Sequence, residues 1–264
     1  LPIFALHPER LGEVAALVIE VTRANYPTLQ VPFHSRWGHF RAGGRNRIAA
    51  MNASLAALDP VERVRTLWDL VIPSVLLDAG AGDRWKFTEG DGTTTSRSEG
   101  LGVASLALFQ SGALSSDPAQ PLRADAGGLK AFSGKKLALA FQVSEANPLV
   151  GCAGRAGLLQ ALGETVARDP LHFPEGRVGS LVDHLVAGHG RTIPAPDLLK
   201  AVLEALGPIW PGRLTLEGRA LGDVWSHPGL GSPGSFESLV PFHKLSQWMT
   251  YSLIEPLLDA GFSV

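Results

Sequence analysis

The stretch LVPFHKLSQWMTYSLIEPLL, residues 239–258, holds the densest set of side chains that could do chemistry. Its apolar residues recur at helical spacing, and Pro241 suits the first turn of a helix. The other face carries His243, Lys244, Gln247, Trp248, Tyr251 and Glu255. These residues indicate either a ligand-binding face or a half-solvated face whose aromatic side chains pack at its edge. Pro256 predicts a stop or kink near the end of this helix.

A second candidate set lies in VPFHSRWGHF, residues 31–40, which shows neither helical nor strand periodicity. Its polar and aromatic members are His34, Arg36, Trp37 and His39. Imidazole, guanidinium and indole groups gathered in one loop are typical of a substrate-binding site. The alternative is a capping loop whose aromatic residues Phe33, Trp37 and Phe40 fill the core.

Two carboxylates stand out by their surroundings. Asp69 lies between Trp68 and Leu70 on an otherwise apolar helix, where a carboxylate must be paired or its pKa must rise. An arginine partner would explain Asp69 without any catalytic role. Glu99, in the sequence RSEG, falls at a helix N-terminus, where it either contacts a ligand or simply complements the helix dipole.

The elements that must position these residues are mostly helices. Helices are predicted over residues 8–25, from Asp59-Pro60 to the Gly80/Gly82 pair, from Glu99 onward, over about 149–167, over 178–186 and 196–206, and over 239–258. Residues 85–98 and the sequence LTLEGRAL, which turns at Glu217-Gly218, predict two β-hairpins. We therefore expect a mainly α protein, a single compact helical domain over residues 1–264 with two short β-hairpins.

Composition limits the class of protein. With 264 residues, 45% hydrophobic and 18% charged, the chain is long enough and apolar enough to bury a sizeable core. A formal charge of −2 argues against nucleic acid as the main partner. The single cysteine, Cys152, fits a reducing, cytoplasmic setting. No apolar run reaches the length of a membrane span, so no membrane partner is expected.

Known chemical motifs are absent from the sequence. It holds no dinucleotide-binding GxGxxG after a strand, no P-loop, no HExxH and no GxSxG. The histidines are too scattered to suggest a metal site by their spacing. We expect no cofactor and no metal.

Several blocks taken together resemble the uracil catabolism protein 4 family. These are VPFHSRWGHF, WDLVIPSVLLDAGAG, RSEGLGVASLALF, NPLVG, LGPIWPGRLTLEG, LGDVW and LVPFHKLSQWMTYSLIEPL. They follow the family's order and cover nearly the whole chain. A fainter resemblance, in the order of the WDL, RSEGLGVASL and FHKLSQ segments, is to the queuosine-nucleotide salvage hydrolases. That resemblance implies an N-glycosidase with a DNA-glycosylase-like helical architecture, in which Asp69, Lys244 and Gln247 match polar residues of the pattern.

The resemblance implies a role in a pyrimidine-degrading route with ribosylurea as a proposed intermediate. We expect an N-ribosidic bond hydrolase that releases urea from ribosylurea or its 5′-phosphate. The alternative is a non-catalytic partner that channels the product of the ring-opening enzyme. Association with other uracil-degradation enzymes is possible in either case. Family members usually continue into a stretch resembling TGLPEYRNGG. We therefore expect this sequence to lack a C-terminal segment that could hold the main acid or base. The sequence opens LPIFALHPERL without an initiator Met, so a short native N-terminal stretch is also expected to be missing.

Cleavage of such a bond develops positive charge on the sugar, so it needs a carboxylate, a delivered water and a donor to the leaving nitrogen. Asp69 and Glu99 are the catalytic candidates. The substrate-binding candidates are His34, Arg36, Trp37, His243, Lys244, Gln247 and Tyr251. Among these, Lys244 and Arg36 would hold a phosphate, and Gln247 would hold the urea or a ribose hydroxyl.

Overall fold

The computed structural model describes residues 8–31, 34–210 and 214–264. The chain divides into two compact units, each described here by itself. The first comprises the described residues up to His34 together with 214–243, and the second comprises 35–210 and 244–264. The expected single domain over residues 1–264 stays a prediction beside this division.

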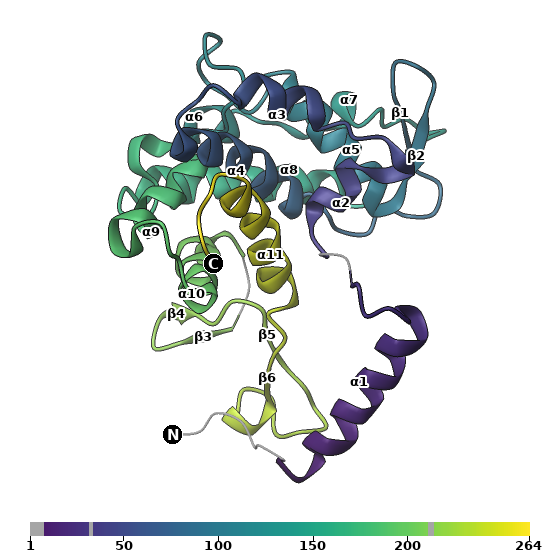
Figure 1. Cartoon of the computed structure of the whole chain (residues 1–264), viewed down its shortest axis with the longest axis vertical. Helices are drawn as coiled ribbons and strands as arrows, with labels where there is room; N and C mark the ends of the chain where they lie inside the picture. The colour runs from purple at the N-terminus through teal and green to yellow at the C-terminus, as the bar shows by residue number, and fades with distance from the viewer. Residues whose placement is uncertain (1–7, 32–33, 211–213) are drawn as a thin grey trace. The chain divides into compact units, whose positions relative to one another are not determined.

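The second unit is built from helices, as expected (Figure 1). Its α-helices are α2 (Arg36–Phe40), α3 (Ala49–Leu55), α4 (Pro60–Leu76), α5 (Arg97–Gln110), α6 (Ala126–Lys130), α7 (Gly134–Ala140), α8 (Cys152–Arg168), α9 (Leu181–His189), α10 (Ala195–Leu206) and α11 (Lys244–Asp259). Short 3₁₀ turns cover Ala42–Gly44, Pro174–Gly176, Val178–Ser180 and Gly207–Ile209. Its strands are β1 (Lys86–Thr88) and β2 (Thr94–Ser96).

The first unit holds one long helix and short strands. A 3₁₀ turn at Pro8–Arg10 leads into α1 (Leu11–Asn25), and a second 3₁₀ turn covers Phe236–Ser238. The strands are β3 (Thr215–Leu216), β4 (Arg219–Ala220), β5 (Val224–Ser226) and β6 (Leu239–Pro241). The mainly α class expected from the sequence is confirmed.

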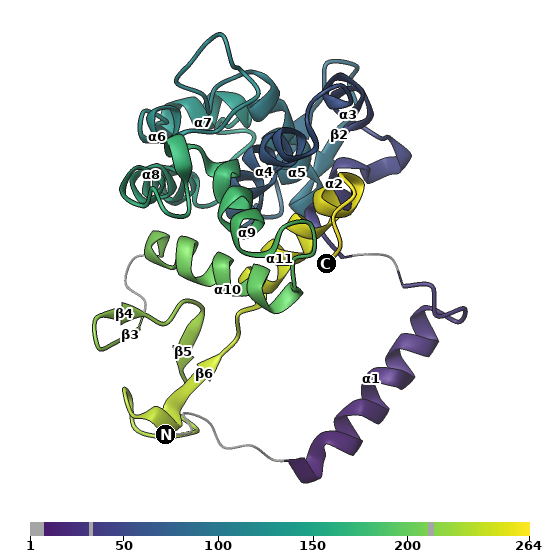
Figure 2. The same cartoon turned by 60° about the vertical axis from the view of Figure 1, so that its left-hand side comes forward.

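Helix α4 is the centre of the second unit. Asp59 caps its N-terminus by accepting a hydrogen bond from the Val61 amide at 2.9 Å, with Pro60 in the first turn, as the sequence predicts. Every residue from Thr66 to Leu76 is buried, because α5, α8, α9 and α11 pack around this helix (Figures 1 and 2). A helix enclosed on all sides can place polar side chains only where they meet partners.

Three antiparallel strand pairs are present among the described residues. The two predicted hairpins are confirmed as β1–β2, with Phe87 opposite Thr95, and as β3–β4. The pair β5–β6 was not predicted; in it Trp225 lies opposite Val240.

The unpredicted strand β6 corrects the start of the C-terminal helix. Residues 239–241 are extended because they pair with β5, so Pro241 belongs to a strand and α11 begins at Lys244. The amides of Phe242 and His243 bond to the Asp223 carbonyl, and His243 has a φ of 44°. The expectation that Pro241 begins the helix was wrong, because strand pairing outweighed its local preference.

Three further expectations need correction or qualification. Residues 36–40 form a helix and not a loop, because the Ser35 side chain accepts a hydrogen bond from the Trp37 amide at 3.3 Å. Helix α4 ends at Leu76, before the predicted glycine pair. Helix α11 continues through Pro256 to Asp259. Trp37 and Phe40 are buried as the capping interpretation expected, whereas Phe33 lies outside the described residues.

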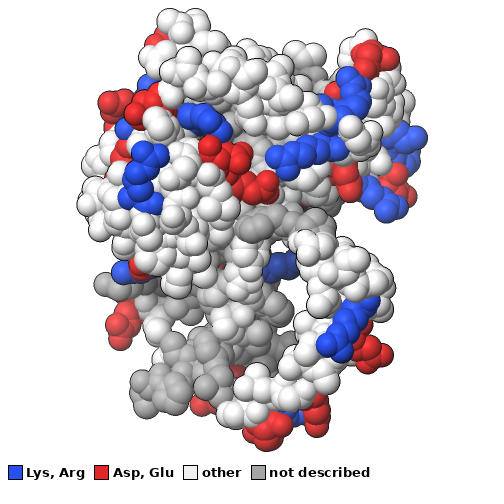
Figure 3. All heavy atoms as spheres, viewed as in Figure 1, with Lys and Arg blue, Asp and Glu red and all other residues white. Residues whose placement is uncertain are grey.

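Two observations bear on partners. No helix in the described part of the chain has the length and apolarity needed to cross a membrane. Among the residues that are coloured or white on the face drawn in Figure 3, lysine and arginine side chains are interspersed with acidic ones and form no extended patch of one sign.

Candidate functional site

A buried arginine organises the candidate site, which we call the Arg36 cluster and define as Arg36, His39, Ser74, Asp78, Ser98, Glu99 and Trp248. The first turn of α2 carries Arg36 inward until the residue is 0% exposed. Its Nε donates to the Ser74 hydroxyl at 2.6 Å, and one terminal nitrogen donates to the Ser74 carbonyl at 3.0 Å. The other terminal nitrogen lies 3.2 Å from an Asp78 carboxylate oxygen. A guanidinium used in this way is a fixed structural charge.

The same terminal nitrogen of Arg36 reaches two further groups. It lies 2.9 Å from His39 Nδ1 and donates to the Ser98 carbonyl at 3.2 Å. A side chain at position 102 would occupy this space, since a Cβ there would lie 2.8 Å from the His39 Cβ. Gly102 on α5 therefore allows α2 and α5 to approach closely enough for the cluster to form.

Helix α11 closes another side of the cluster with Trp248. The indole ring centre lies 5.7 Å from both the Arg36 guanidinium carbon and the His39 ring centre. A guanidinium over an indole face is a favourable cation–π arrangement. The predicted polar face of this helix thus contacts α2 at Trp248. It contacts the α2 region again at Glu255, which accepts a hydrogen bond from Ser35 and pairs with Arg41 at 3.4 Å.

Burial and charge set the electrostatics of the cluster. Burial lowers the pKa of Arg36 to about 10, against the opposing attraction of Asp78, so the side chain remains charged at neutral pH. Glu99 adds negative charge and Arg155 adds positive charge to its surroundings. The field around Arg36 thus comes from two carboxylates and a second guanidinium.

Arg155 fixes the end of α4 and with it Asp78. This residue, in the first turn of α8, donates to the carbonyls of Leu77, Ala79 and Gly80, the last two at 3.0 and 2.8 Å. A helix C-terminus leaves such carbonyls unpaired, and the guanidinium satisfies them. Asp78 lies among these carbonyls, at the negative end of the helix dipole. Its ion-pair partner there is Arg36, at 3.2 Å.

Sequence reasoning missed Asp78 and Arg155. The sequence signal for Asp78 was its position in LLDAGAG, after an apolar helix. A carboxylate there is destabilised by the negative C-terminal end of the helix dipole, so a positively charged partner is expected. For Arg155 no comparable signal exists, because its role depends on carbonyls more than 70 residues earlier in the chain.

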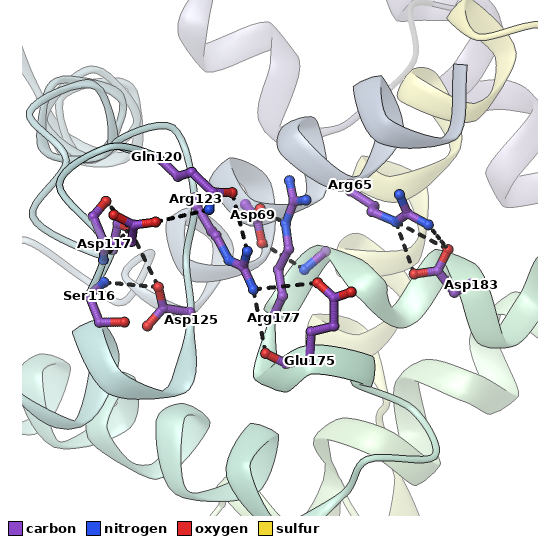
Figure 4. Close-up of polar contacts among 12 residues, drawn as sticks. Arg65, Asp69, Ser116, Asp117, Gln120, Arg123, Asp125, Glu175, Arg177 and Asp183 are labelled. Atoms are coloured by element: carbon purple, nitrogen blue, oxygen red, sulfur yellow. Dashed lines mark hydrogen bonds and ion pairs between the residues drawn. The ribbon is translucent and has the colours of Figure 1, made fainter. Parts of the chain in front are cut away.

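Asp69 belongs to a different group, which we call the Arg177 network and define as Glu62, Thr66, Asp69, Arg177 and Gly179. Figure 4 shows Asp69 and Arg177 of this network. One Asp69 oxygen accepts from Arg177 Nε at 2.6 Å and the other from the Gly179 amide at 2.7 Å. Asp69 bonds to Arg177 and Gly179, whereas Arg36 bonds to Ser74 and pairs with Asp78, so the two groups share no residue. The structure therefore does not bring Asp69 together with Arg36.

The arginine partner that the sequence left open for Asp69 is thus present. Asp69 is 0% exposed, and Arg177 also donates to Glu62 at 2.6 Å. The close approach of this segment requires Gly179, whose Cβ would lie 2.0 Å from the Arg65 carbonyl oxygen. Burial raises the pKa of Asp69 to about 7, against the opposing effects of Arg177 and the Gly179 amide. A catalytic role for Asp69 stays a prediction, and its contacts are those of a structural ion pair.

The remaining predicted residues lie in several places. Glu99, Lys244, Gln247 and Tyr251 are exposed in the second unit, and Trp37 is buried there, donating from Nε1 to the Ser252 carbonyl at 2.7 Å. His34 and His243 belong to the first unit. The Arg36 side chain has no exposed surface with which to hold a phosphate, so its predicted direct contact with substrate is not supported by this geometry.

Neither of two cavities elsewhere in the second unit includes a predicted residue. One, of about 330 Å³, lies between α5 and the β1–β2 hairpin and is lined in part by Arg47, Phe87, Glu89 and Gln142. The other, of about 160 Å³, lies between α9 and α10. Among the described residues, no group of three or more His, Cys, Asp or Glu side chains could hold a metal ion.

The fold and the Arg36 cluster define a helical protein in which one buried guanidinium pairs with Asp78 and packs against the Trp248 indole of α11. A family model described as proteins of unknown function, DUF1688, matches residues 1–264, and the chain belongs to this family. None of the solved structures matches the chain. The DNA-glycosylase-like architecture and the likeness to the salvage hydrolases therefore stay predictions.

Two curated proteins are similar over nearly the whole chain. The protein urg3 of Schizosaccharomyces pombe is 39% identical over 266 residues, which cover 96% of this chain and 61% of that protein. Uracil catabolism protein 4 of Lachancea kluyveri is 37% identical over 276 residues, which cover 98% of this chain and 63% of that protein. The chain thus spans about three-fifths of the length of these relatives. Their similarity confirms the family resemblance found in the sequence.

Proposed function

We propose that this chain takes part in uracil catabolism as a hydrolase of an N-ribosidic bond, releasing urea from ribosylurea or its 5′-phosphate. The name of the Lachancea kluyveri relative supports the route. The observation that carries the reaction type is the Arg36 cluster, in which an exposed carboxylate and a nearly buried one flank a fixed positive charge. Two carboxylates near one reacting centre are the usual requirement for hydrolysis at an anomeric carbon.

In this proposal Glu99 activates the water. Its side chain is exposed, and it interacts electrostatically with Arg36. A charged carboxylate can take a proton from water as the oxygen attacks the sugar. Asp78, by contrast, is held by Arg36 with its side chain only 11% exposed. It supplies negative charge near the sugar ring as positive charge develops there.

The exposed face of α11 supplies substrate contacts. Lys244, Gln247 and Tyr251 offer an ammonium, an amide and a phenol beside Trp248. An indole face suits the flat apolar surface of a sugar, and the amide matches the donors and acceptors of urea. Lys244 lies at the N-terminus of α11, where unpaired amides also favour an anion.

The experiment is mass spectrometry of products after separate incubation with ribosylurea and ribosylurea 5′-phosphate. We expect urea and the corresponding sugar from at least one of them. Glu99→Gln should lower kcat by about a hundredfold or more, the usual contribution of a general base. Glu89→Gln, which removes a carboxylate paired with Arg47 outside the cluster, is the matched control and should retain activity. No urea from either substrate would overturn the proposal.

A second candidate function, a non-catalytic partner of the ring-opening enzyme, is favoured by one observation. The apolar stripe of α1 is exposed, with Leu11 at 68% and Leu17 at 60%. Exposed apolar surfaces of this kind often bind proteins. This function is tested by co-sedimentation of the wild type and of Leu17→Glu with the ring-opening enzyme. If the wild type does not bind, or if the substitution leaves binding unchanged, α1 is not the docking surface.

A further inference from the structure

The larger of the two cavities in the second unit has no part in the proposed reaction. It lies between α5 and the β1–β2 hairpin and has a volume of about 330 Å³. Small-molecule sites have volumes of about 300–1,000 Å³, so this cavity is large enough for a small ligand. It shares helix α5 with the Arg36 cluster but none of that cluster's residues. It is therefore a separate candidate site.

The inner wall of the cavity is apolar. Four residues of α5 line it at the spacing of one helical face, namely Val103, Leu106, Ala107 and Gln110. Val103 and Leu106 are buried, as is Phe87 of β1, which also lines the cavity. Ala107 is exposed, and its small side chain leaves the opening clear. Aromatic and aliphatic side chains arranged around a cavity suit the flat face of a ring.

The charged residues beside the cavity bind each other. Arg47 donates from Nε to one Glu89 oxygen at 2.8 Å and from a terminal nitrogen to the other at 2.7 Å. Its second terminal nitrogen donates to the Ala42 carbonyl at 2.6 Å. A guanidinium and a carboxylate paired in this way neutralise each other. A charged ligand would have to compete with this pair, so the cavity favours a neutral molecule.

Two glutamines line the cavity, and they differ in what their amides bind. Gln142 is occupied at both ends, because its Oε1 accepts from the Thr88 amide at 2.9 Å and its Nε2 donates to the Thr88 carbonyl at 2.7 Å. The exposed Gln110 side chain makes no hydrogen bond or ion pair with another described residue. A primary amide offers an acceptor and a donor side by side. Gln110 can therefore form two hydrogen bonds with a ligand whose N–H lies beside its C=O.

We propose that this cavity binds a small neutral ring that contains an amide, with its N–H and C=O on the same edge. The ring would lie against Phe87 and Leu106, and the amide edge would pair with Gln110. Cyclic amides and cyclic ureas have this chemistry. The inference does not depend on the proposed hydrolysis, because it concerns binding at a place outside the Arg36 cluster.

Uracil is a suitable probe, since it is a small neutral ring with N–H groups beside C=O groups. A ligand-detected NMR titration would measure its Kd for the wild type, with 1,3-dimethyluracil, which has no N–H, as the control ligand. We expect saturable binding of uracil and binding of the dimethyl compound that is weaker by about tenfold, the effect of losing a hydrogen-bonded edge. Absence of uracil binding, or an equal Kd for the two compounds, would overturn the inference.

Two variants locate the binding. Ala107→Phe places a large side chain at the opening and should abolish uracil binding. Ala167→Phe, at an exposed position of α8 outside the cavity, is the matched control and should leave the Kd unchanged. Gln110→Leu, which keeps the size of the side chain but removes the amide, should weaken binding by about tenfold.

Thermal unfolding would verify that the variants are folded. Because Gln110 is exposed, Gln110→Leu tests the site even if Ala107→Phe does not fold. Uracil binding that persists in folded Ala107→Phe, or that is unchanged in Gln110→Leu, would place the ligand elsewhere and overturn the inference. None of these measurements requires release of urea, so failure of the proposed function would leave this inference standing.

Discussion

Two buried arginines show how much the role of a residue depends on its interaction partners. Arg36 meets a serine, a histidine and Asp78 beside exposed groups, whereas Arg177 meets Asp69 and Glu62 in an interior network. Both are surrounded by acids, yet only Arg36 lies beside side chains that a substrate can reach. The sequence singled out Arg36 but not Arg177, and the surroundings of each arginine in the structure show their different roles.

At the residue scale, the raised pKa of Asp69 gives a prediction with a definite sign. The folded pKa of about 7 exceeds the ordinary value of 3.8, so the folded state binds this proton more tightly than the unfolded state does. Stability from such a group is fully present below pH 3.8 and is lost as the pH rises through 7. Asp69→Asn cannot titrate. We therefore expect the stability of the wild type, relative to the variant, to fall by up to about 1.4 kcal/mol per pH unit between those values.

Urea unfolding of both proteins at several pH values measures this difference. A wild-type advantage that grows with pH would show that Asp69 is ionised in the folded protein and that Arg177 dominates over burial. Turnover provides a separate control. Folded Asp69→Asn should keep its activity if the residue is structural, and loss of turnover would support the catalytic role predicted from the sequence.

Lys244 gives a second prediction at this scale. The side chain is exposed at the N-terminus of α11, where it can meet a phosphate without desolvation of a buried group. Lys244→Met should raise KM for ribosylurea 5′-phosphate by about ten- to a hundredfold, because a charge-assisted contact contributes about 1.5–3 kcal/mol. KM for ribosylurea should barely change. Equal losses on both substrates would assign Lys244 to the ribose or to the chemistry.

At the scale of elements, α11 passes through Pro256 because another helix supplies the missing donor. Proline has no N–H, so the Ser252 carbonyl four residues earlier loses its helical partner. The Trp37 indole of α2 donates to that carbonyl at 2.7 Å, and the Arg36 amide donates to the Ser252 hydroxyl at 3.0 Å. The turn of α11 that lacks a helical hydrogen bond is thus the place where α2, the helix that carries Arg36, is attached.

This arrangement predicts the behaviour of a double substitution. Trp37→Phe should lower the free energy of unfolding by about 1–3 kcal/mol, because the Ser252 carbonyl is left buried without a donor. Pro256→Ala restores a helical N–H at that position. In the Trp37→Phe background it should therefore recover part of the loss, and a double-mutant cycle measures the coupling. Strictly additive effects would contradict the replacement of one donor by the other.

The sequence predicted most helices because their signals are local. Asp59-Pro60 fixed the start of α4, and the apolar spacing from Leu11 to Val21 gave α1. The strand at Leu239–Pro241 could not be found in this way, since it depends on pairing with Val224–Ser226. For the site, Arg36 and Glu99 were identified by their chemistry. Arg155 was missed because its role arises only where α8 meets the end of α4, and Asp78 was missed because its partner Arg36 lies on α2.

At the scale of the whole molecule, the two units differ in how much they bury. Helix α1 has no buried residue, and in the described part of the first unit the buried apolar side chains are Val224 and Leu239. Helix α4 in the second unit is buried at every residue from Thr66 to Leu76. Opening free energies follow buried apolar area, so we expect amide hydrogens in α1 to exchange much faster than those in α4. Hydrogen-exchange mass spectrometry measures this, and equal protection would show that α1 is covered in solution.

The depth at which Arg36 and Asp78 meet has a consequence for ionic strength. Dissolved ions screen charges beyond about 8 Å under physiological conditions, but they act weakly on groups enclosed in protein. The Arg36–Asp78 pair, with the arginine side chain at 0% exposure, is shielded from them, whereas exposed Lys244 is not. Added salt should therefore weaken the capture of an anionic substrate while leaving the organisation of the cluster unchanged. A titration with salt would separate the charge that attracts a ligand from the charge that holds the site together.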